Sequence, residues 1–347
     1  MLRTFALPAM AVAAALLGAQ PSAAQSQPEP IKITIGFGGD GLYHFYPIYV
    51  AMAEHFFEKE GLKVDWLTLR GGSQLVASLV GGSAQVAPAA LEHMVVPGER
   101  AAGLVEFAEL FAVDPYTVVL SNKAMAKSGI KPDMPLKEKL SRLKGLTIGI
   151  TAPGGASDTF VRFLMKQNGL NADGLVHLQP MASVPAMLGA LQRNMVDGLS
   201  MSTPIDTMAV SKGYGQVAIS AFSIPSLQGM PFTGMMATRT YIAQHPEVIT
   251  KVTRALTEAI KFNIDHPEQT RKDIFQYSVV KDPKVYDAMI RQYQRGAART
   301  PVLTEAEFDK VAKWVQMGEK EPIKADFAAS VDNSFAKKAA AEILGSE

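Results

Sequence analysis

The sequence of 347 residues contains no cysteine, and this absence excludes several kinds of chemistry at once. Disulfide bonds, thiol nucleophiles and cysteine-ligated zinc are all ruled out. An excess of charge of one sign is also missing, because 34 Lys and Arg residues nearly balance 33 Asp and Glu residues. A formal net charge of +1 offers no basic surface for a phosphate backbone, so we expect no nucleic-acid partner.

The N-terminal apolar run is too short to span a bilayer, and no later stretch could do so. Residues 1–24 place Arg3 before this run and the small residues Ser22, Ala23 and Ala24 after it. This order of a basic, an apolar and a small-residue region is typical of a secretory signal peptide. We therefore predict that residues 1–24 are a signal peptide and that the mature chain is exported to the periplasm.

The rest of the chain, about 320 residues, exceeds what one hydrophobic core usually supports, so two domains are expected. Short apolar runs alternate with amphipathic stretches, a pattern that predicts an α/β fold with mostly parallel sheets. From residue 241 onward the apolar spacing is helical only, and we predict that this C-terminal section packs on one lobe. The predicted strands cover residues 31–37, 63–67, 105–112, 116–120, 146–150, 197–201, 217–221 and 232–238.

One internal similarity concerns the relation between the two halves of the chain. Residues 79–86 align without a gap with residues 191–198, and each segment is typical of a helix end, a break and a short strand. Such units occur in many α/β proteins, so the repeat gains weight only together with other observations. The hypothesis is that the two lobes are related.

Four loops, each directly after a predicted strand, carry glycine, hydroxyl or aromatic residues. Open α/β sheets bind ligands at the carboxyl ends of their strands, and helix N-termini there present free backbone N–H groups. The alternative for each loop is that glycine only permits a tight turn and serine only caps a helix. The candidate ligand-binding residues are Tyr43, His44, Gly71, Gly72, Ser73, Ala89, Gly154, Gly155, Ala156, Ser157, Ser202 and Thr203.

Other kinds of site have little support in the sequence. The spacing G-x-G-x-x-G occurs at residues 36–41, but an aromatic loop follows where a dinucleotide site needs the first turn of a helix. The six histidines never occur at metal-ligand spacing, and no G-x-S-x-G elbow is present. We therefore expect no cofactor, no metal site and no catalytic residues, that is, a binding protein rather than an enzyme.

Several short segments resemble one known family. They cover residues 35–37, 47–51, 57–65, 71–73 and 146–155. At these positions the chain resembles the solute-binding proteins of ABC transporters that handle sulfonates, taurine, nitrate and the pyrimidine precursors of thiamine. The resemblance runs from about residue 31 to residue 239, and the segments occur in the expected order.

The resemblance implies a type II periplasmic-binding fold, with two lobes joined by a two-segment hinge and extra C-terminal helices. The first lobe would hold residues 31–114 and 234–347, and the second lobe residues 115–233. It also implies that the lobes close on a small molecule and deliver it, chemically unchanged, to the membrane permease of an ABC importer. We expect a monomer.

The ligand stays open between two classes at this point. An organic anion such as a sulfonate or a carboxylate is expected first, and a pyrimidine is the alternative. Many relatives carry an acidic residue shortly after the first helix break, whereas residues 83–85 of this chain lack it and only Asp197 occupies the matching place in the second half. Related fungal pyrimidine synthases use a cysteine-rich motif that is missing here, and a sensory membrane receptor is the alternative partner.

Overall fold

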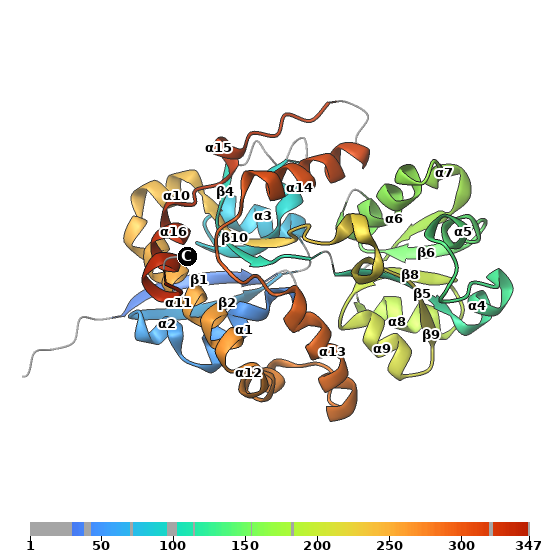
Figure 1. The fold of residues 1–347 in the computed structure, drawn as a ribbon, viewed down its shortest axis with the longest axis horizontal. Helices are drawn as coiled ribbons and strands as arrows, with labels where there is room; N and C mark the ends of the chain where they lie inside the picture. Colours follow the sequence, from blue (N-terminus) through green and yellow to red (C-terminus); the bar gives the residue numbers. More distant parts are fainter. Residues whose placement is uncertain are drawn as a thin grey trace, which may run out of the picture.

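The computed structural model describes residues 30–37, 43–69, 72–95, 103–113, 115–153, 155–181, 184–318 and 322–345. Its strands form two groups that lie in two lobes, with C-terminal helices beside and between them (Figure 1). The first lobe holds β1 to β4 and β10, and the second holds β5 to β9. The predicted two-lobed α/β architecture is therefore confirmed.

In the first lobe, β1 and β2 pair in parallel along their whole length. β10 lies antiparallel between β3 and β4, and an isolated parallel bridge joins Ile35 of β1 to Val86, just before β3. These contacts give the strand order β2-β1-β3-β10-β4. The strands are β1 (Ile31–Phe37), β2 (Leu62–Thr68), β3 (Ala87–Ala90), β4 (Leu104–Phe111) and β10 (Thr233–Thr238).

The second lobe contains one five-stranded sheet with the order β7-β6-β8-β5-β9. β6 is parallel to β7 and β8, whereas β5 is antiparallel to β8 and β9. Each lobe thus has an antiparallel strand, β10 or β5, at the fourth position of its order. The strands are β5 (Tyr116–Ser121), β6 (Thr147–Ile150), β7 (His177–Pro180), β8 (Gly198–Ser202) and β9 (Gly215–Ser220).

Helices cover the sheets of both lobes (Figure 1). None of the described helices is both long and apolar enough to cross a membrane. The first lobe and the C-terminal section contain α1 (Tyr46–Ala53), α2 (Phe56–Lys59), α3 (Gly72–Val80), α10 (Arg239–Gln244), α11 (Pro246–Asp265), α12 (Pro267–Asp273), α13 (Pro283–Gly296), α14 (Glu305–Gly318), α15 (Phe327–Ser330) and α16 (Ser334–Ile343). The second lobe contains α4 (Asn122–Ser128), α5 (Leu136–Ser141), α6 (Ala156–Gln167), α7 (Ala172–Leu175), α8 (Val184–Gln192) and α9 (Ile205–Ser211). Short 3-10 helices are η1 (Tyr43–Phe45), η2 (Leu91–Met94), η4 (Ala221–Ser223), η5 (Pro225–Leu227) and η6 (Ile274–Tyr277).

Helix α11 illustrates how apolar spacing produces packing. Pro246 lies in its first turn, where the missing N–H removes no helical hydrogen bond. Val252, Leu256 and Ile260 recur every four residues and are buried on one face, which contacts α1 and α16. Each fully buried side chain of this size contributes about 1.5–3 kcal/mol to folding.

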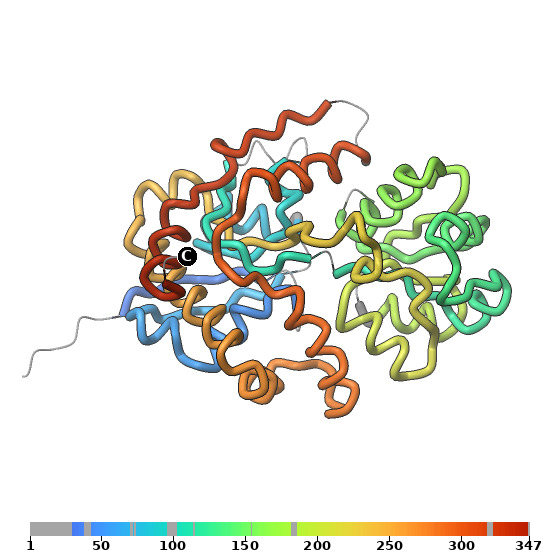
Figure 2. The backbone as a smooth tube through the Cα atoms, in the orientation of Figure 1, coloured from blue at the N-terminus to red at the C-terminus, as the bar shows by residue number. Residues whose placement is uncertain are grey.

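The chain crosses between the lobes twice, first between β4 and β5 and again between β9 and β10 (Figure 2). One residue of α13 contacts both crossovers. The ring of Tyr293 stacks on Phe111 at the end of β4 and meets Phe222 of η4 edge-on, with centroids 5.5 Å apart in each pair. Tyr293 therefore connects the two crossovers of the hinge through aromatic contacts.

The C-terminal section, which was predicted to pack on one lobe, contacts elements of both lobes. α10, α11, α12, α15 and α16 contact elements of the first lobe, but α13 and α14 also contact α9 and α6 of the second (Figure 1). For α14 this contact is aromatic, since Trp314 stacks on Phe163 with ring centroids 4.1 Å apart. Helical spacing predicted these helices, but not the surfaces that their apolar faces meet.

The internal similarity corresponds to equivalent turns in the two lobes. After α3, Gly82 has a left-handed backbone with φ +74°, and after α8 the aligned Asn194 has φ +52°. Glycine and asparagine are the residues that adopt this conformation most readily. The two aligned residues therefore share one backbone conformation, which is what the hypothesis of related lobes predicts.

Gln85 and Asp197 are also aligned, and each holds a neighbouring strand in the same way. The N–H of Gln85 donates to the carbonyl of Thr34 at 3.0 Å, and its side-chain Oε1 accepts from the Thr34 N–H at 2.6 Å. The N–H of Asp197 donates to the carbonyl of Thr147 at 2.8 Å, and its Oδ2 accepts from the Thr147 N–H at 2.9 Å. The amide of Gln85 and the carboxylate of Asp197 therefore accept equivalent hydrogen bonds from a strand N–H.

Candidate ligand-binding cleft

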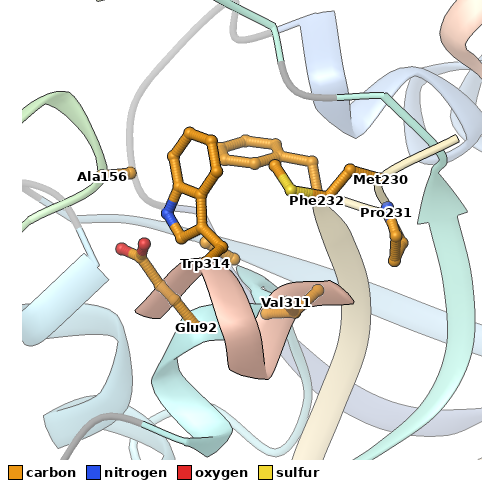
Figure 3. A pocket seen from close by; sticks show the side chains of 8 residues that line it. Glu92, Ala156, Met230, Pro231, Phe232, Val311 and Trp314 are labelled. Carbon is orange, nitrogen blue, oxygen red and sulfur yellow. The ribbon is translucent and has the colours of Figure 1, made fainter. Parts of the chain in front are cut away.

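A pocket lies between the two lobes, beside the second crossover (Figure 3). Both lobes, the crossover and helix α14 contribute side chains to it. It is partly open to solvent, and its cavity volume of about 20 Å³ has room for about one water molecule. Its lining residues are Ala90, Glu92, Ala156, Met230, Pro231, Phe232, Val311 and Trp314.

The lining is apolar and aromatic apart from one carboxylate. In Figure 3 the indole of Trp314 stands at the centre, with Glu92 and Ala156 on one side and Phe232 on the other. Lysine and arginine are absent from the lining residues, and the described ranges contain no group of three or more His, Asp or Glu side chains suited to a metal. The pocket thus offers aromatic faces, an apolar wall and one acidic acceptor.

Of the two residues from the first predicted loop, His44 packs behind the wall of this pocket, whereas the Tyr43 ring contacts Tyr286 and Tyr293 of α13. Both belong to η1 and are buried. The His44 ring meets the ring of Phe232, a lining residue, edge-on at 5.1 Å. Burial lowers the pKa of His44 to about 3, so its imidazole is neutral, and burial raises the pKa of Tyr43 to about 12. His44 therefore supports the pocket wall at Phe232, and neither His44 nor Tyr43 is a lining residue.

The second predicted loop is described only in part. Gly71 and the side chain of Ser73 lie outside the described residues, whereas Gly72 is the first residue of α3. A Cβ atom at Gly72 would overlap the imidazole of His93 in η2. Glycine is therefore required here by the close approach of η2, the same element that carries Glu92 into the pocket.

The third predicted loop brings one residue to the pocket. Gly154 lies outside the described residues, Gly155 is the N-cap of α6, and Ala156 lines the pocket. Ser157 is fully buried, and its Oγ accepts a hydrogen bond from the Thr151 N–H at 2.9 Å. A second hydrogen bond of 2.9 Å joins the hydroxyls of Ser157 and Thr151, so this serine fixes the loop.

The N-terminus of α6 already has a negative group in its first turn. Asp158 is buried there and forms an ion pair with Arg162 at 2.9 Å. A carboxylate at this place interacts with the positive end of the helix dipole. A bound anion would share that helix end with Asp158, which reduces the attraction expected from the sequence.

The remaining predicted residues are buried at the ends of β3 and β8. Ala89 lies in β3 and Ser202 ends β8. The Thr203 hydroxyl donates to Asp206 Oδ1 at 2.7 Å, and the Thr203 N–H donates to the hydroxyl oxygen of Tyr293 at 3.0 Å. Thr203 therefore joins the second lobe to α13 at the hinge, and none of the three is a lining residue.

Reasoning from the sequence missed most of the lining. Glu92 lies two residues after β3, and the rule that located the other loops did not reach it because β3 itself was not predicted. Trp314 is one of only two tryptophans and lies three residues after Val311, on the same helix face. The missed residues are Ala90, Glu92, Met230, Pro231, Phe232, Val311 and Trp314.

Comparison with known proteins agrees with this geometry. The sequence model of the NMT1-like family matches residues 26–279, which is more than half of the chain. The chain belongs to the NMT1-like family. Helices α13 and α14 lie beyond the matched residues, so this NMT1-like protein builds its interlobe helices from sequence outside the match.

Two relatives carry names of binding proteins. The NMT1-like chain is 22% identical over 304 residues to the candidate binding protein YtlA of Bacillus subtilis, covering 86% of this chain and 87% of the relative. It is 28% identical over 127 residues to the nitrate/nitrite binding protein NrtA of a Nostoc species, covering 37% of this chain and 28% of that protein.

Solved structures share the fold. A protein of Bordetella bronchiseptica matches with a TM-score of 0.77 and 25% identity, over 91% of this chain and 99% of that one. The periplasmic aliphatic sulphonate binding protein SsuA of Escherichia coli matches with a TM-score of 0.63 and 15% identity, over 83% of this chain and 92% of that one. The periplasmic-binding fold and the resemblance to ABC-transporter solute-binding proteins, both inferred from the sequence, are confirmed for this NMT1-like protein.

Proposed function

We propose that this chain captures a small organic solute between its two lobes and delivers it to an ABC importer. The observation that carries the proposal is a pocket lined from both lobes in a chain of the NMT1-like family. The names of its relatives, which are binding proteins, add support. We propose further that it acts as a periplasmic monomer whose partner is a membrane permease, and that it is not an enzyme.

Closure of the lobes would follow from contacts on both sides of the pocket. A solute that touches Glu92 on the first lobe and Ala156 on the second gains both contacts only when the lobes are close together. Its binding therefore stabilises the closed form by the difference in affinity between the two forms. No bond of the solute changes in this mechanism, so the molecule that enters is the molecule delivered.

The first class of solute that we propose is an organic anion such as a sulfonate or a carboxylate. Two relatives are named for nitrate or nitrite and for aliphatic sulphonate. Ala156 places the N-terminal turn of α6 at the pocket, and a helix N-terminus attracts an exposed anion by about 0.3–1 kcal/mol. The organic part of the solute would lie against Trp314 and Phe232.

A second candidate, a pyrimidine or a similar flat heterocycle, is favoured by one specific observation. The single charged lining residue, Glu92, is an acceptor, and aromatic rings stand beside it. A heterocycle with N–H groups could donate to this carboxylate and stack on the indole of Trp314. Asp158 in the first turn of α6 also makes that helix end less attractive for an anion.

The experiment that tests the function is a binding screen of the chain from residue 25 onward, by thermal shift followed by titration calorimetry. A solute that binds only the folded state raises the melting temperature. Ala156→Leu narrows the pocket and should weaken binding at least tenfold, whereas Ala126→Leu on the exposed face of α4 should not. Absence of a shift with every anion and pyrimidine, or unchanged binding by Ala156→Leu, would contradict the proposal.

Glu92→Gln separates the two solute classes. Removal of the negative charge should leave the affinity for an anion unchanged or raise it. It should lower the affinity for a heterocycle that donates N–H groups to the carboxylate. Mass spectrometry of the solute recovered after incubation tests the absence of catalysis, because a transport protein returns it unaltered. A changed mass would instead indicate an enzyme.

A further inference from the structure

Helix α14 forms a connection between the lobes in addition to the two crossovers, and its first half contacts α15, which packs on β4 of the first lobe. Thr304 and Glu307 form a capping box, in which the Thr304 N–H donates to the Glu307 carboxylate at 2.9 Å and the Glu307 N–H donates to Thr304 Oγ1 at 3.3 Å. One turn further on, the ring of Phe308 meets Phe327 of α15 at 5.6 Å.

The second half of α14 reaches the second crossover and the second lobe. Lys310 Nζ donates to the carbonyl oxygen of Gly229 in the second crossover at 2.8 Å. Trp314 then stacks on Phe163 of α6, with ring centroids 4.1 Å apart and ring planes 22° apart, and lies 6.2 Å from the ring of Phe160. A helix of 14 residues is about 21 Å long, enough to reach from one lobe across the crossover to the other.

We propose that α14 is an interlobe clasp, in which the stack of Trp314 on Phe163 holds the lobes in the closed arrangement before any solute binds. Trp314 is 4% exposed and Phe163 is 5% exposed, so their stacked rings are almost fully excluded from water. Moving α6 away from the first lobe exposes both faces to water, and this cost increases with the apolar area uncovered. Opening of the lobes therefore requires release of the stack.

The hinge residue Tyr293 differs from the clasp in where it makes its contacts. Its ring packs on the crossovers, at Phe111 and Phe222, and its hydroxyl accepts from the Thr203 N–H at 3.0 Å; these contacts lie at the hinge, where a rotation of the lobes moves atoms least. Trp314 instead packs on α6, which belongs to the moving lobe. Trp314 also lines the pocket, so an entering solute touches the clasp directly.

The clasp can be tested without any solute, so its outcome is independent of the proposed function. Because the chain has no cysteine, spin labels attach only to cysteines introduced at two exposed lysines, Lys63 in the first lobe and Lys144 in the second. Pulsed electron paramagnetic resonance then gives the distance distribution between the lobes. We expect one narrow distribution for the labelled parent and a shift to longer, broader distances for Trp314→Leu.

Matched variants distinguish a clasp from a general loss of packing. Phe163→Leu should lengthen the distance as Trp314→Leu does, and the double variant should go no further than either one, because both remove the same contact. Phe308→Leu removes a similarly buried ring of α14 that meets Phe327 of the first-lobe helix α15 edge-on, and it should leave the distance unchanged. Identical distributions for the parent and Trp314→Leu, or an equal lengthening by Phe308→Leu, would overturn the proposal.

Discussion

Acidification should destabilise this protein through one buried imidazole. His44 is 6% exposed, and its Nδ1 has no hydrogen-bond partner within the described part of the chain. Its ring lies edge-on to Phe45 at 4.4 Å and to Phe232 at 5.1 Å, and neither ring can compensate a positive charge as a carboxylate would. Burial alone therefore lowers the pKa of His44 from its ordinary value of 6.5 to about 3.

The sign of the effect follows from proton binding. Between pH 6.5 and pH 3 the unfolded chain binds a proton at His44 that the folded protein does not bind, so acid favours unfolding. This contribution to stability is complete above pH 6.5 and is lost progressively as the pH falls toward 3. Each pH unit inside this window corresponds to about 1.4 kcal/mol, so a change from pH 7.5 to pH 5 removes about 2 kcal/mol.

The assay is urea denaturation of the wild type and His44→Phe at both pH values. Phenylalanine keeps the aromatic contacts and cannot bind a proton, so the variant should lose about 2 kcal/mol less unfolding free energy on acidification than the wild type. His177→Gln, at an exposed site in β7, is the control and should follow the wild type. Equal pH dependence of the wild type and His44→Phe would refute the reasoning.

Three further predictions concern other buried contacts. Burial raises the pKa of Glu109 to about 8, so stability is lost as the pH rises from 4.5 toward 8. An increase from pH 4.5 to pH 7 should therefore lower the unfolding free energy of the wild type by about 3 kcal/mol more than that of Glu109→Gln, as measured by urea denaturation. Gln85→Ala and Asp197→Ala should each lower the unfolding free energy by about 1–3 kcal/mol, because a strand N–H loses its acceptor, and calorimetry should find solute affinity unchanged by either. Gly72→Val should lower the melting temperature, because its Cβ overlaps an imidazole, whereas Gly155→Val, whose Cβ would lie 3.4 Å or more from its neighbours, should change it little; equal losses would contradict this difference.

The architecture could be predicted from the sequence because the spacing of apolar residues is a local signal. The expected strand over residues 31–37 is β1 with the same bounds, and the expected strand over residues 116–120 differs from β5 by one residue. Two strands were missed, β3 with the sequence APAA and β7 with the sequence HLQP. Both have four residues and lack β-branched side chains, so their strand conformation depends on pairing with β10 and β6.

The site could be predicted only in its position. The rule that ligands bind after the carboxyl ends of strands led to Ala156, which lines the pocket. The serine beside it, Ser157, was expected to face the ligand, but its hydroxyl bonds to Thr151 within the loop. The aromatic wall from Trp314 depends on long-range packing of α14 against the second lobe, and no local pattern reports such a contact.

The repeat between the lobes indicates where solute specificity should lie. Gln85 and Asp197 form equivalent hydrogen bonds to neighbouring strands. The amide at one position and the carboxylate at the other therefore have a structural role in each lobe and do not determine which solute binds. The pocket, in contrast, is asymmetric: the second lobe contributes Ala156, while Glu92 and Trp314 come from the first lobe and from the C-terminal helix that extends it. Helix α14 has no counterpart in the repeat and lies beyond the family match. Substitutions of Glu92 and Trp314 should therefore alter the solute specificity more than substitutions of Ala156.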